Sequence, residues 1–197
     1  MKDEQLEIIN ENDEVIGHES RKVIHQKGLL HREIHIWFIT PNQEIVFQHR
    51  AKDKDTYPDK LDATVGGHVE PGMSYEDTAI KEAEEETGIK LDLSKLKLVK
   101  KIRKESFDEA TGLINNTIRS QYVYLFNGNI EDLQIETGKA TGFESWKINK
   151  LNSLPEEDRN KFIPLILSGD MLGIFDEGQK ILGGPDPEFR TRILYNY

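Results

Sequence analysis

The segment from Gly66 to Ile89 constrains the fold of this chain more than any other, because it joins a glycine turn to a short acidic helix. It reads GGHVEPGMSYEDTAIKEAEEETGI. Ser74 is of a residue type that caps the start of helices, and Asp77 follows it at the spacing of a capping box. Gly88 can take the left-handed conformation that ends a helix. The pattern therefore predicts a short helix between Ser74 and Gly88.

Three glutamates of this helix, Glu82, Glu85 and Glu86, stand at i, i+3 and i+4 and so share one face. Like charges this close repel one another and cost helix stability unless a cation neutralises them. Mg²⁺ and Mn²⁺ prefer carboxylate oxygen, so the spacing indicates a divalent metal site. The alternative is a solvated acidic face without a ligand. The glycine turn, the cap and the stop, all in register, favour the metal site.

The same segment resembles the signature of the Nudix hydrolases, G-x5-E-x7-R-E-U-x-E-E-x-G-U, in which U is an aliphatic residue. The matching residues are Gly67, Glu82, Ala83, Glu85, Glu86, Gly88 and Ile89. Two positions depart from the signature: Met73 stands where it has a glutamate, and Lys81 stands where it has an arginine. Lys81 keeps the positive charge but lacks the planar fork of arginine. Met73 is the larger change, because it removes a carboxylate beside the turn.

The resemblance implies an α/β fold, the Nudix-type α/β/α sandwich with a mixed sheet. It also implies hydrolysis of a diphosphate linked to another moiety, with Mg²⁺ or Mn²⁺ held by the three glutamates and by the backbone carbonyl of Gly67. A cation held in this way lowers the pKa of a bound water. A carboxylate then accepts the proton of that water. The candidates for this base are Glu82, Glu86 and, from a later strand, Glu144.

The likeness extends over about residues 5–150 to the Nudix branch that contains isopentenyl diphosphate isomerase. The shared pairs are Leu30-His31, His49-Arg50 and Tyr57-Pro58. The isomerases use a cysteine in the turn before the helix, where this chain has Gly66, and the chain has no cysteine at all. They also hold a metal with histidines, which His31 and His68 match, and with two glutamates of a later strand. That strand reads Arg119-Ser120-Gln121 here. We therefore expect a hydrolase rather than an isomerase.

A diphosphate substrate needs fixed positive charge on the side away from the metal. Arg50, at the end of an expected strand, is the first candidate, and Arg32 is the second, each with an ordinary surface charge as the alternative. His31 and His68 are candidates for contact with substrate phosphate or metal, although a structural role, bonding a backbone carbonyl, is the reading we favour. Lys81 completes the candidate substrate-binding set. The remaining histidines have no spacing that indicates a site: His18, His25, His35 and His49.

Length and charge bear on the number of domains, the class of partner and the location of the protein. The chain has 197 residues and a formal net charge of −10. This length fits one domain, so we expect a single Nudix domain over 1–197, with a core at about 5–182 and a C-terminal tail at 183–197. The acidic balance argues against nucleic-acid or membrane partners. A polar start, no long apolar run and no cysteine favour the cytoplasm. The sequence does not decide between a monomer and a homodimer.

The other elements are predicted from the spacing of apolar residues and from the positions of turn-forming residues. The expected strands are two within 5–17, joined by a turn at 10–13, and then 33–39, 44–49, 96–106, 117–126 and 143–148. A helical or irregular connector is expected within 18–31, and helices are expected at 155–167 and 171–181.

The expected partner is a small-molecule diphosphate, most simply a nucleoside diphosphate derivative. An isomerase-like protein and a Nudix module that binds a ligand without catalysis are the alternatives. A module that has lost catalysis tends to lose its metal ligands, because buried carboxylates without a metal are costly. All three helix glutamates are present, which favours an enzyme.

Overall fold

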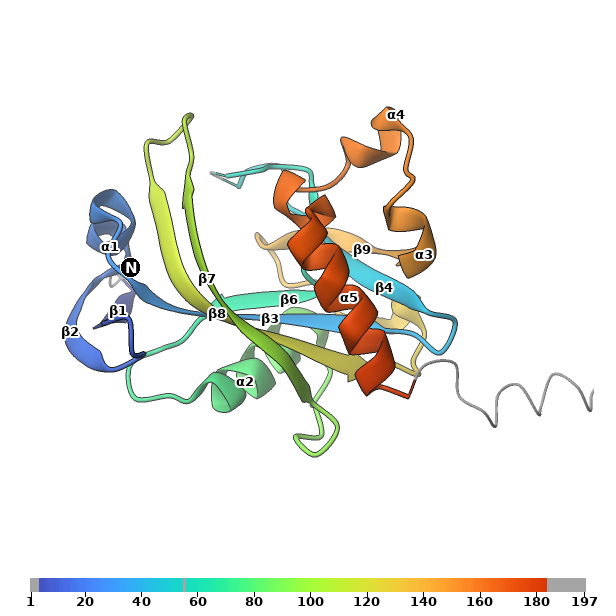
Figure 1. Ribbon diagram of the computed structural model, residues 1–197, viewed down its shortest axis with the longest axis horizontal. Coiled ribbons are helices and arrows are strands. Elements are labelled where there is room, and N and C mark those ends of the chain that lie inside the picture. The colour runs from blue at the N-terminus through green and yellow to red at the C-terminus, as the bar shows by residue number, and fades with distance from the viewer. Residues whose placement is uncertain (1–3, 55, 184–197) are drawn as a thin grey trace, which may run out of the picture.

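A mixed β-sheet runs through the middle of the molecule (Figure 1). The structure is a computed structural model and describes residues 4–54 and 56–183. Its strands are β3 (His31–Ile39), β4 (Glu44–Arg50), β5 (Leu61–Asp62), β6 (Val65–His68), β7 (Lys97–Phe107), β8 (Ile114–Leu125) and β9 (Ala140–Lys147). The spatial order is β5-β4-β3-β8-β7, with β6 also paired to β3 and β9 to β4. The β3–β8 pair is parallel and the other pairs are antiparallel, so the sheet is mixed.

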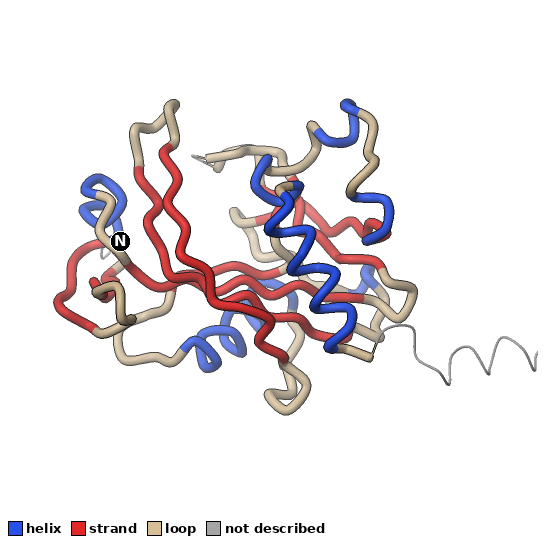
Figure 2. Tube along the Cα trace, in the orientation of Figure 1, coloured by secondary structure: helices blue, strands red, loops and turns tan. Residues whose placement is uncertain are grey.

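Helices cover both faces of this sheet (Figures 1 and 2). They are α1 (Arg21–Lys27), α2 (Tyr75–Thr87), α3 (Ile148–Leu151), α4 (Glu156–Arg159) and α5 (Gly169–Ile181), with 3-10 turns η1 (Ile130–Asp132) and η2 (Pro164–Leu167). On one face, Ala79 and Ala83 of α2 join the apolar cluster that contains Ile34. On the other face, the ring of Phe175 in α5 packs 4.8 Å from that of Trp37. Successive residues of β3 thus serve opposite cores, and the α/β/α sandwich predicted from the sequence is confirmed.

A separate hairpin precedes the sheet. β1 (Gln5–Ile9) and β2 (Val15–Ser20) pair with each other around a turn in which Asp13 has a φ of 63°. Helix α1 follows directly, with Ser20 as its N-cap and Gly28 as its left-handed C-cap. Asn116 of β8 donates a hydrogen bond to the carbonyl of Gly28 at 2.8 Å. The end of α1 is thereby fixed against the sheet, close to the start of β3.

The predicted strands and the last helix are confirmed, although β2 runs on to Ser20 and the short strands β5 and β6 were not predicted. The helix predicted over 155–167 is wrong. The chain forms only α4 and the 3-10 turn η2 there. Between them, the backbone of Leu61 donates to Lys161 at 2.7 Å and accepts from Ile163 at 3.1 Å. This bridge to β5 draws the segment out of helical conformation, and Pro164 has no N–H to continue a helix. The final strand also ends at Lys147, one residue before the predicted end.

Apart from residue 183, the predicted C-terminal tail lies outside the described residues. Within 4–54 and 56–183, no helix has the length and apolar character needed to cross a membrane.

Candidate functional site

Helix α2 begins and ends where its sequence predicts. The Ser74 hydroxyl accepts a hydrogen bond from the Asp77 N–H at 3.0 Å and donates one to the Asp77 carboxylate at 2.7 Å. Gly88 follows the helix with a φ of 72°, and its N–H bonds the carbonyl of Glu84 at 3.0 Å. These caps set the rotation of the helix, so the glutamates are held on a fixed face.

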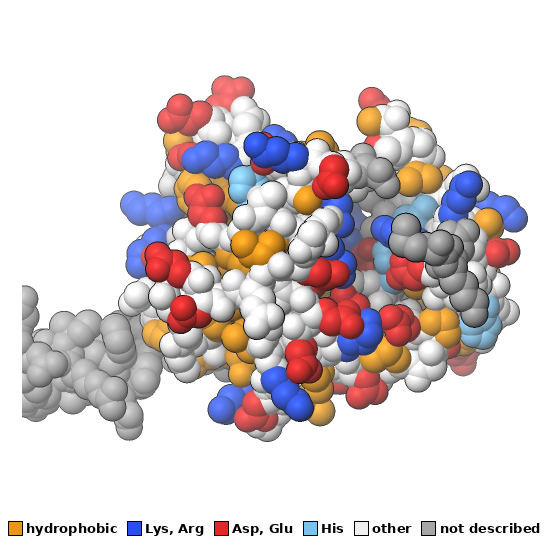
Figure 3. Space-filling view, turned by 180° about the vertical axis from the view of Figure 1, so that it is seen from behind, with side chains coloured by type: hydrophobic (Ala, Val, Ile, Leu, Met, Phe, Trp, Pro, Cys, Tyr) orange, Lys and Arg blue, Asp and Glu red, His pale blue; other side chains and the backbone are white. Residues whose placement is uncertain are grey.

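Glu82 and Glu86 converge on one cation, the ammonium of Lys139. The Lys139 Nζ atom lies 3.2 Å from Glu82 Oε2 and 3.1 Å from Glu86 Oε1. It also lies 3.2 Å from Glu136 Oε2, in the turn that leads into β9. Seen from the side opposite to Figure 1, acidic and basic side chains gather around a hollow in the middle of the face (Figure 3). Three carboxylates thus share a single positive charge at this point.

The second oxygen of Glu86 is also held. Glu86 Oε2 accepts from the side-chain amide of Gln48 at 3.1 Å and from the N–H of Gly66 at 3.2 Å. The carboxylate is almost fully buried, and this burial raises the pKa of Glu86 to about 7 against the opposing effect of Lys139. The sheet and the glycine turn therefore position this side chain as firmly as its own helix does.

Glu85 points further toward solvent and is paired with Lys81. Lys81 Nζ lies 3.1 Å from Glu85 Oε2, 2.9 Å from Glu70 Oε1 and 3.5 Å from Glu82 Oε1. Burial lowers the pKa of Lys81, but the hydrogen bonds to Glu70 and Glu85 raise it by more. Lys81 thus bridges the turn and two glutamates of the helix, even without the fork of an arginine.

Gly67 leaves room that a side chain would fill. A β-carbon built on Gly67 would lie 2.7 Å from Cδ of Glu82, which is too close for the two to coexist without movement. The absence of a side chain lets the Glu82 carboxylate lie against the backbone of β6. Met73, which replaces a glutamate of the signature, packs against the apolar cluster under α2 instead.

The residues around Lys139 suit a hard divalent cation. Glu82 and Glu86 offer carboxylate oxygens, the ligands that Mg²⁺ and Mn²⁺ prefer, and the backbone of Gly67 lies against Glu82. These oxygens already surround one cationic group, the lysine ammonium. Glu85 is linked to Glu82 through Lys81. The sequence predicted that Glu82, Glu85 and Glu86 converge, whereas the structure brings Glu82 and Glu86 together and pairs Glu85 with Lys81. The sequence gave no sign of Lys139 or Gln48.

The two candidate arginines are committed to protein partners. Arg50 donates to Asp62 at 2.9 Å and to the carbonyls of Thr56 and Tyr57 at 2.8 and 3.2 Å, so it holds the loop before β5. Arg32 pairs with Glu7 at 3.0 Å and with Asp13 at 2.6 Å in the N-terminal hairpin. Neither guanidinium has a described contact with a glutamate of α2. Contact with substrate stays a prediction for both.

Glu144 does not reach the helix glutamates. In the β4–β9 pairing it lies opposite Phe47, while Phe143 lies opposite Gln48. Gln48 faces α2 and bonds Glu86, so the register places Glu144 on the other face of the sheet. This geometry counts against Glu144 among the three candidate bases and leaves Glu82 and Glu86.

His31 and His68 lie together with a third histidine, His25. Their ring centroids are 5.0–5.2 Å apart, and one nitrogen from each ring falls within 4.8 Å of the others. His25 and His31 each bond a backbone carbonyl through Nδ1, of Arg21 at 2.8 Å and of Leu29 at 2.9 Å. Burial lowers the pKa of His68 to about 3. The sequence has no spacing that indicates a site at His25, and the structure brings it to His31 and His68 because α1 packs against β8.

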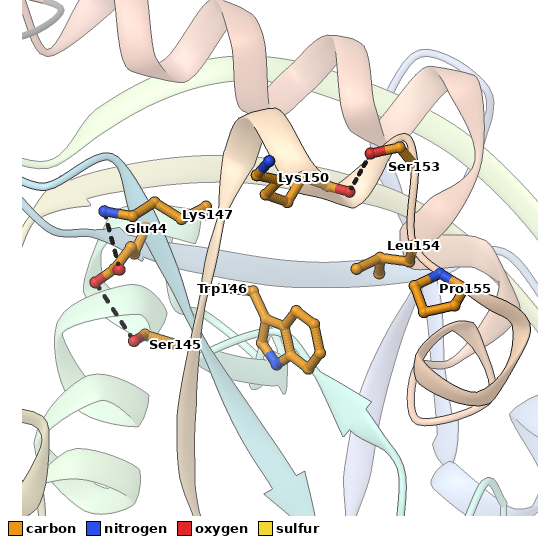
Figure 4. Close-up of a pocket in the computed structure, with 8 residues that line it drawn as sticks. All are labelled: Glu44, Ser145, Trp146, Lys147, Lys150, Ser153, Leu154 and Pro155. Atoms are coloured by element: carbon orange, nitrogen blue, oxygen red, sulfur yellow. Dashed lines mark hydrogen bonds and ion pairs between the residues drawn. The ribbon is translucent and has the colours of Figure 1, made fainter.

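A separate pocket of about 390 Å³ lies between β9 and the α3–α4 connection (Figure 4). It is lined by Glu44, Ser145, Trp146, Lys147, Lys150, Ser153, Leu154 and Pro155. Its one carboxylate, Glu44, is paired with Lys147 at 3.2 Å. Because it contains no residue of α2 or of the glycine turn, this pocket is not part of the glutamate site.

Comparison with protein families matches residues 29–166 to the NUDIX domain. An uncharacterized Nudix hydrolase of Clostridium acetobutylicum is 31% identical over 154 residues, which cover 77% of this chain and 73% of that protein. An uncharacterized Nudix hydrolase of Streptomyces coelicolor is 41% identical over 86 residues, or 44% of this chain and 48% of that protein. Nudix hydrolase 3 of Arabidopsis thaliana is 25% identical over 89% of this chain, but over only 23% of its own length. The chain therefore spans less than half of two of these three relatives.

Solved structures share the fold at low sequence identity. The Deinococcus radiodurans protein DR0079 matches with a TM-score of 0.66 at 18% identity, over 88% of this chain and 98% of that one. The MutT protein of Methanosarcina mazei matches with a TM-score of 0.59 at 16% identity, over 77% of this chain and 96% of that one. These likenesses concern the fold alone.

Proposed function

Because this chain belongs to the Nudix family, we propose that it is a hydrolase that cleaves a diphosphate linkage in a nucleoside diphosphate derivative, with Mg²⁺ or Mn²⁺ as its metal. The observation that carries this proposal is the convergence of Glu82 and Glu86 on one cation position beside Gly67. The fold and the relatives support the family. The metal, the substrate class and the residue roles are the proposed part.

The chain's own residues have distinct tasks in this proposal. Glu82, Glu85 and Glu86 hold the metal, which when bound supplies charge neutralisation and lowers the pKa of a water. Gln48 and the N–H of Gly66 keep Glu86 in place as a ligand or as the base that accepts a proton. Lys81 orients Glu82 and Glu85, and because its three N–H donors are taken by Glu70, Glu82 and Glu85, it would reach the substrate only by releasing one of these contacts. Positive charge from Arg50 would reach the phosphates only after its loop contacts rearrange.

The test is turnover of a panel of nucleoside di- and triphosphates, nucleotide sugars, dinucleotides and isoprenoid diphosphates. We expect one class to be hydrolysed with Mg²⁺ or Mn²⁺ and not with EDTA. Glu85→Gln is expected to lower that turnover at least tenfold, because it removes one charged ligand of a metal site. Metal binding without turnover would point to an untested substrate. No turnover and no metal binding would favour the non-catalytic module.

A second candidate function, isomerisation of an isoprenoid diphosphate, is favoured by one observation, the cluster of His25, His31 and His68. The isomerase resemblance implies a metal held by histidines. Gly66 in place of the isomerase cysteine, and Ser120 and Gln121 on the later strand, count against it. Proton exchange into isopentenyl diphosphate, followed by NMR in deuterated water, separates this activity from hydrolysis.

The histidine cluster makes a prediction of its own. We expect Zn²⁺ to bind there in the presence of excess Mg²⁺, because three imidazoles are good zinc ligands and two of these rings are already oriented by backbone carbonyls. In isothermal titration, the His31→Gln variant should no longer bind Zn²⁺. His18→Gln, on the exposed hairpin, is the matched control. Equal Zn²⁺ affinity in both variants would rule out a zinc site at the histidine cluster.

A further inference from the structure

The strongest unexplained feature of the site is the position of Lys139. Its ammonium lies among Glu82, Glu86 and Glu136, at 3.1–3.2 Å from one oxygen of each. This is the region in which the proposed function puts a divalent cation. Gly66 and Gln48 bind the far oxygen of Glu86, so the oxygen that faces Lys139 is the one left for a cation.

We propose that the Lys139 ammonium is the internal counter-cation of the metal-free site and that a divalent metal binds by displacing it. The inference rests on the proposed function, since it names the residue that competes with that function's metal. Glu82 and Glu86 are both more than nine-tenths buried, and such carboxylates are costly to leave without a positive charge. Lys139 supplies that charge when no metal is bound.

The two cations exclude each other at this position. Mg²⁺ binds carboxylate oxygens at about 2.0–2.1 Å, so it would lie within the space that the ammonium now takes between the same oxygens. A divalent ion and an ammonium held there together would repel strongly in a partly buried setting. One of them must leave.

The chain around Lys139 allows the side chain to move while the backbone stays. The carbonyl of Lys139 accepts from the N–H of Ala51 at 3.0 Å, and its own N–H bonds the carbonyl of Glu136 at 3.1 Å. Gly138, at a φ of 81°, forms the turn just before β9. The side chain is about one-third exposed, so its flexible stem has solvent to swing into.

The test is the affinity of the full-length protein for Mn²⁺ alone, measured by isothermal titration on the wild type, Lys139→Met and Lys147→Met. Removing the competitor is expected to tighten Mn²⁺ binding about tenfold, within the usual range for coupled ligands. Lys147 is the matched control, because it ends β9, the strand that Lys139 directly precedes, and pairs with one glutamate, Glu44, away from α2. Its variant should bind Mn²⁺ as the wild type does.

The outcomes separate the two proposals. Equal or weaker binding by Lys139→Met, with a wild type that binds Mn²⁺, would overturn the displacement and leave the hydrolase intact. No binding by either protein would overturn both. Binding by the variant alone would support displacement.

A second measurement avoids any folding defect of the variant. In wild-type protein labelled with ¹³C at lysine Cε, Mg²⁺ should shift the Lys139 resonance and leave that of Lys147 in place. An unmoved Lys139 resonance at saturating Mg²⁺ would also overturn the displacement.

Discussion

Glu86→Gln is expected to lower turnover of the diphosphate substrate about a thousandfold, which corresponds to about 4 kcal/mol of transition-state stabilisation. The substitution keeps the shape of the side chain and removes its negative charge. One oxygen of Glu86 is already fixed by Gln48 and the N–H of Gly66, so the loss falls on the oxygen that faces Lys139 and the proposed metal. Metal affinity should fall together with turnover.

Glu84→Gln is the matched control for this variant. Glu84 lies on the same helix, two residues earlier, with its side chain exposed. It should keep wild-type turnover and Mn²⁺ affinity. Urea unfolding of both variants should show midpoints close to the wild type, which would separate loss of function from loss of fold. Turnover by Glu86→Gln above one-tenth of the wild-type value would show that this carboxylate is not a ligand or the base.

Local features of the site were readable from the sequence because their causes are local. The cap at Ser74, the stop at Gly88 and the shared face of the glutamates all depend on spacings of a few residues. The resemblance added the fold and the meaning of the glycine turn. The crowding of Gly67 against Glu82 agrees with that reading, since a turn so close to a helix carboxylate leaves no space for a side chain.

Contacts made across the sheet could not be read in the same way. Lys139 lies 53 residues beyond Glu86, in a polar turn that has no motif, and only the β4–β9 pairing brings it to the helix. His25 joins His31 and His68 because α1 folds back against the sheet, which no spacing announces. These are tertiary placements, decided by strand register for Lys139 and by the packing of α1 for His25.

Glu144 is a different case, because a signal was available. Residues two apart on a strand face the same side of a sheet. Trp146 packs 5.3 Å from Phe162, in the core on the face away from α2. An acidic residue at 144 therefore shares that face, and alternation alone could have separated it from the glutamates of the helix.

Arg119→Met is expected to lower the free energy of unfolding by about 3–5 kcal/mol, because it leaves the Glu33 carboxylate buried without its charge partner. The two residues lie opposite each other in the parallel β3–β8 pair, and Arg119 Nε donates to Glu33 Oε2 at 2.9 Å. Asn115 donates to the other oxygen at 3.2 Å. Burial raises the pKa of Glu33, but Arg119 and the neighbouring histidines together lower it to well below its usual range. The pair's contribution is therefore present at pH 7 and is lost as the pH falls through the folded-state pKa.

The double variant Glu33→Leu/Arg119→Met decides how that loss arises. If the cost of Arg119→Met is the isolated charge, removing both charges should recover most of the stability, because apolar side chains of similar volume often replace a buried ion pair without loss. Urea unfolding of the wild type, both single variants and the double variant gives the coupling directly. Additive losses would mean that each side chain acts through its own packing. A strong coupling would mean that the ion pair itself joins β3 to β8. This pair lies beside the histidine cluster, because His68 Nε2 is 3.4 Å from Glu33. In that case Zn²⁺ binding by the histidines should also weaken in Glu33→Leu.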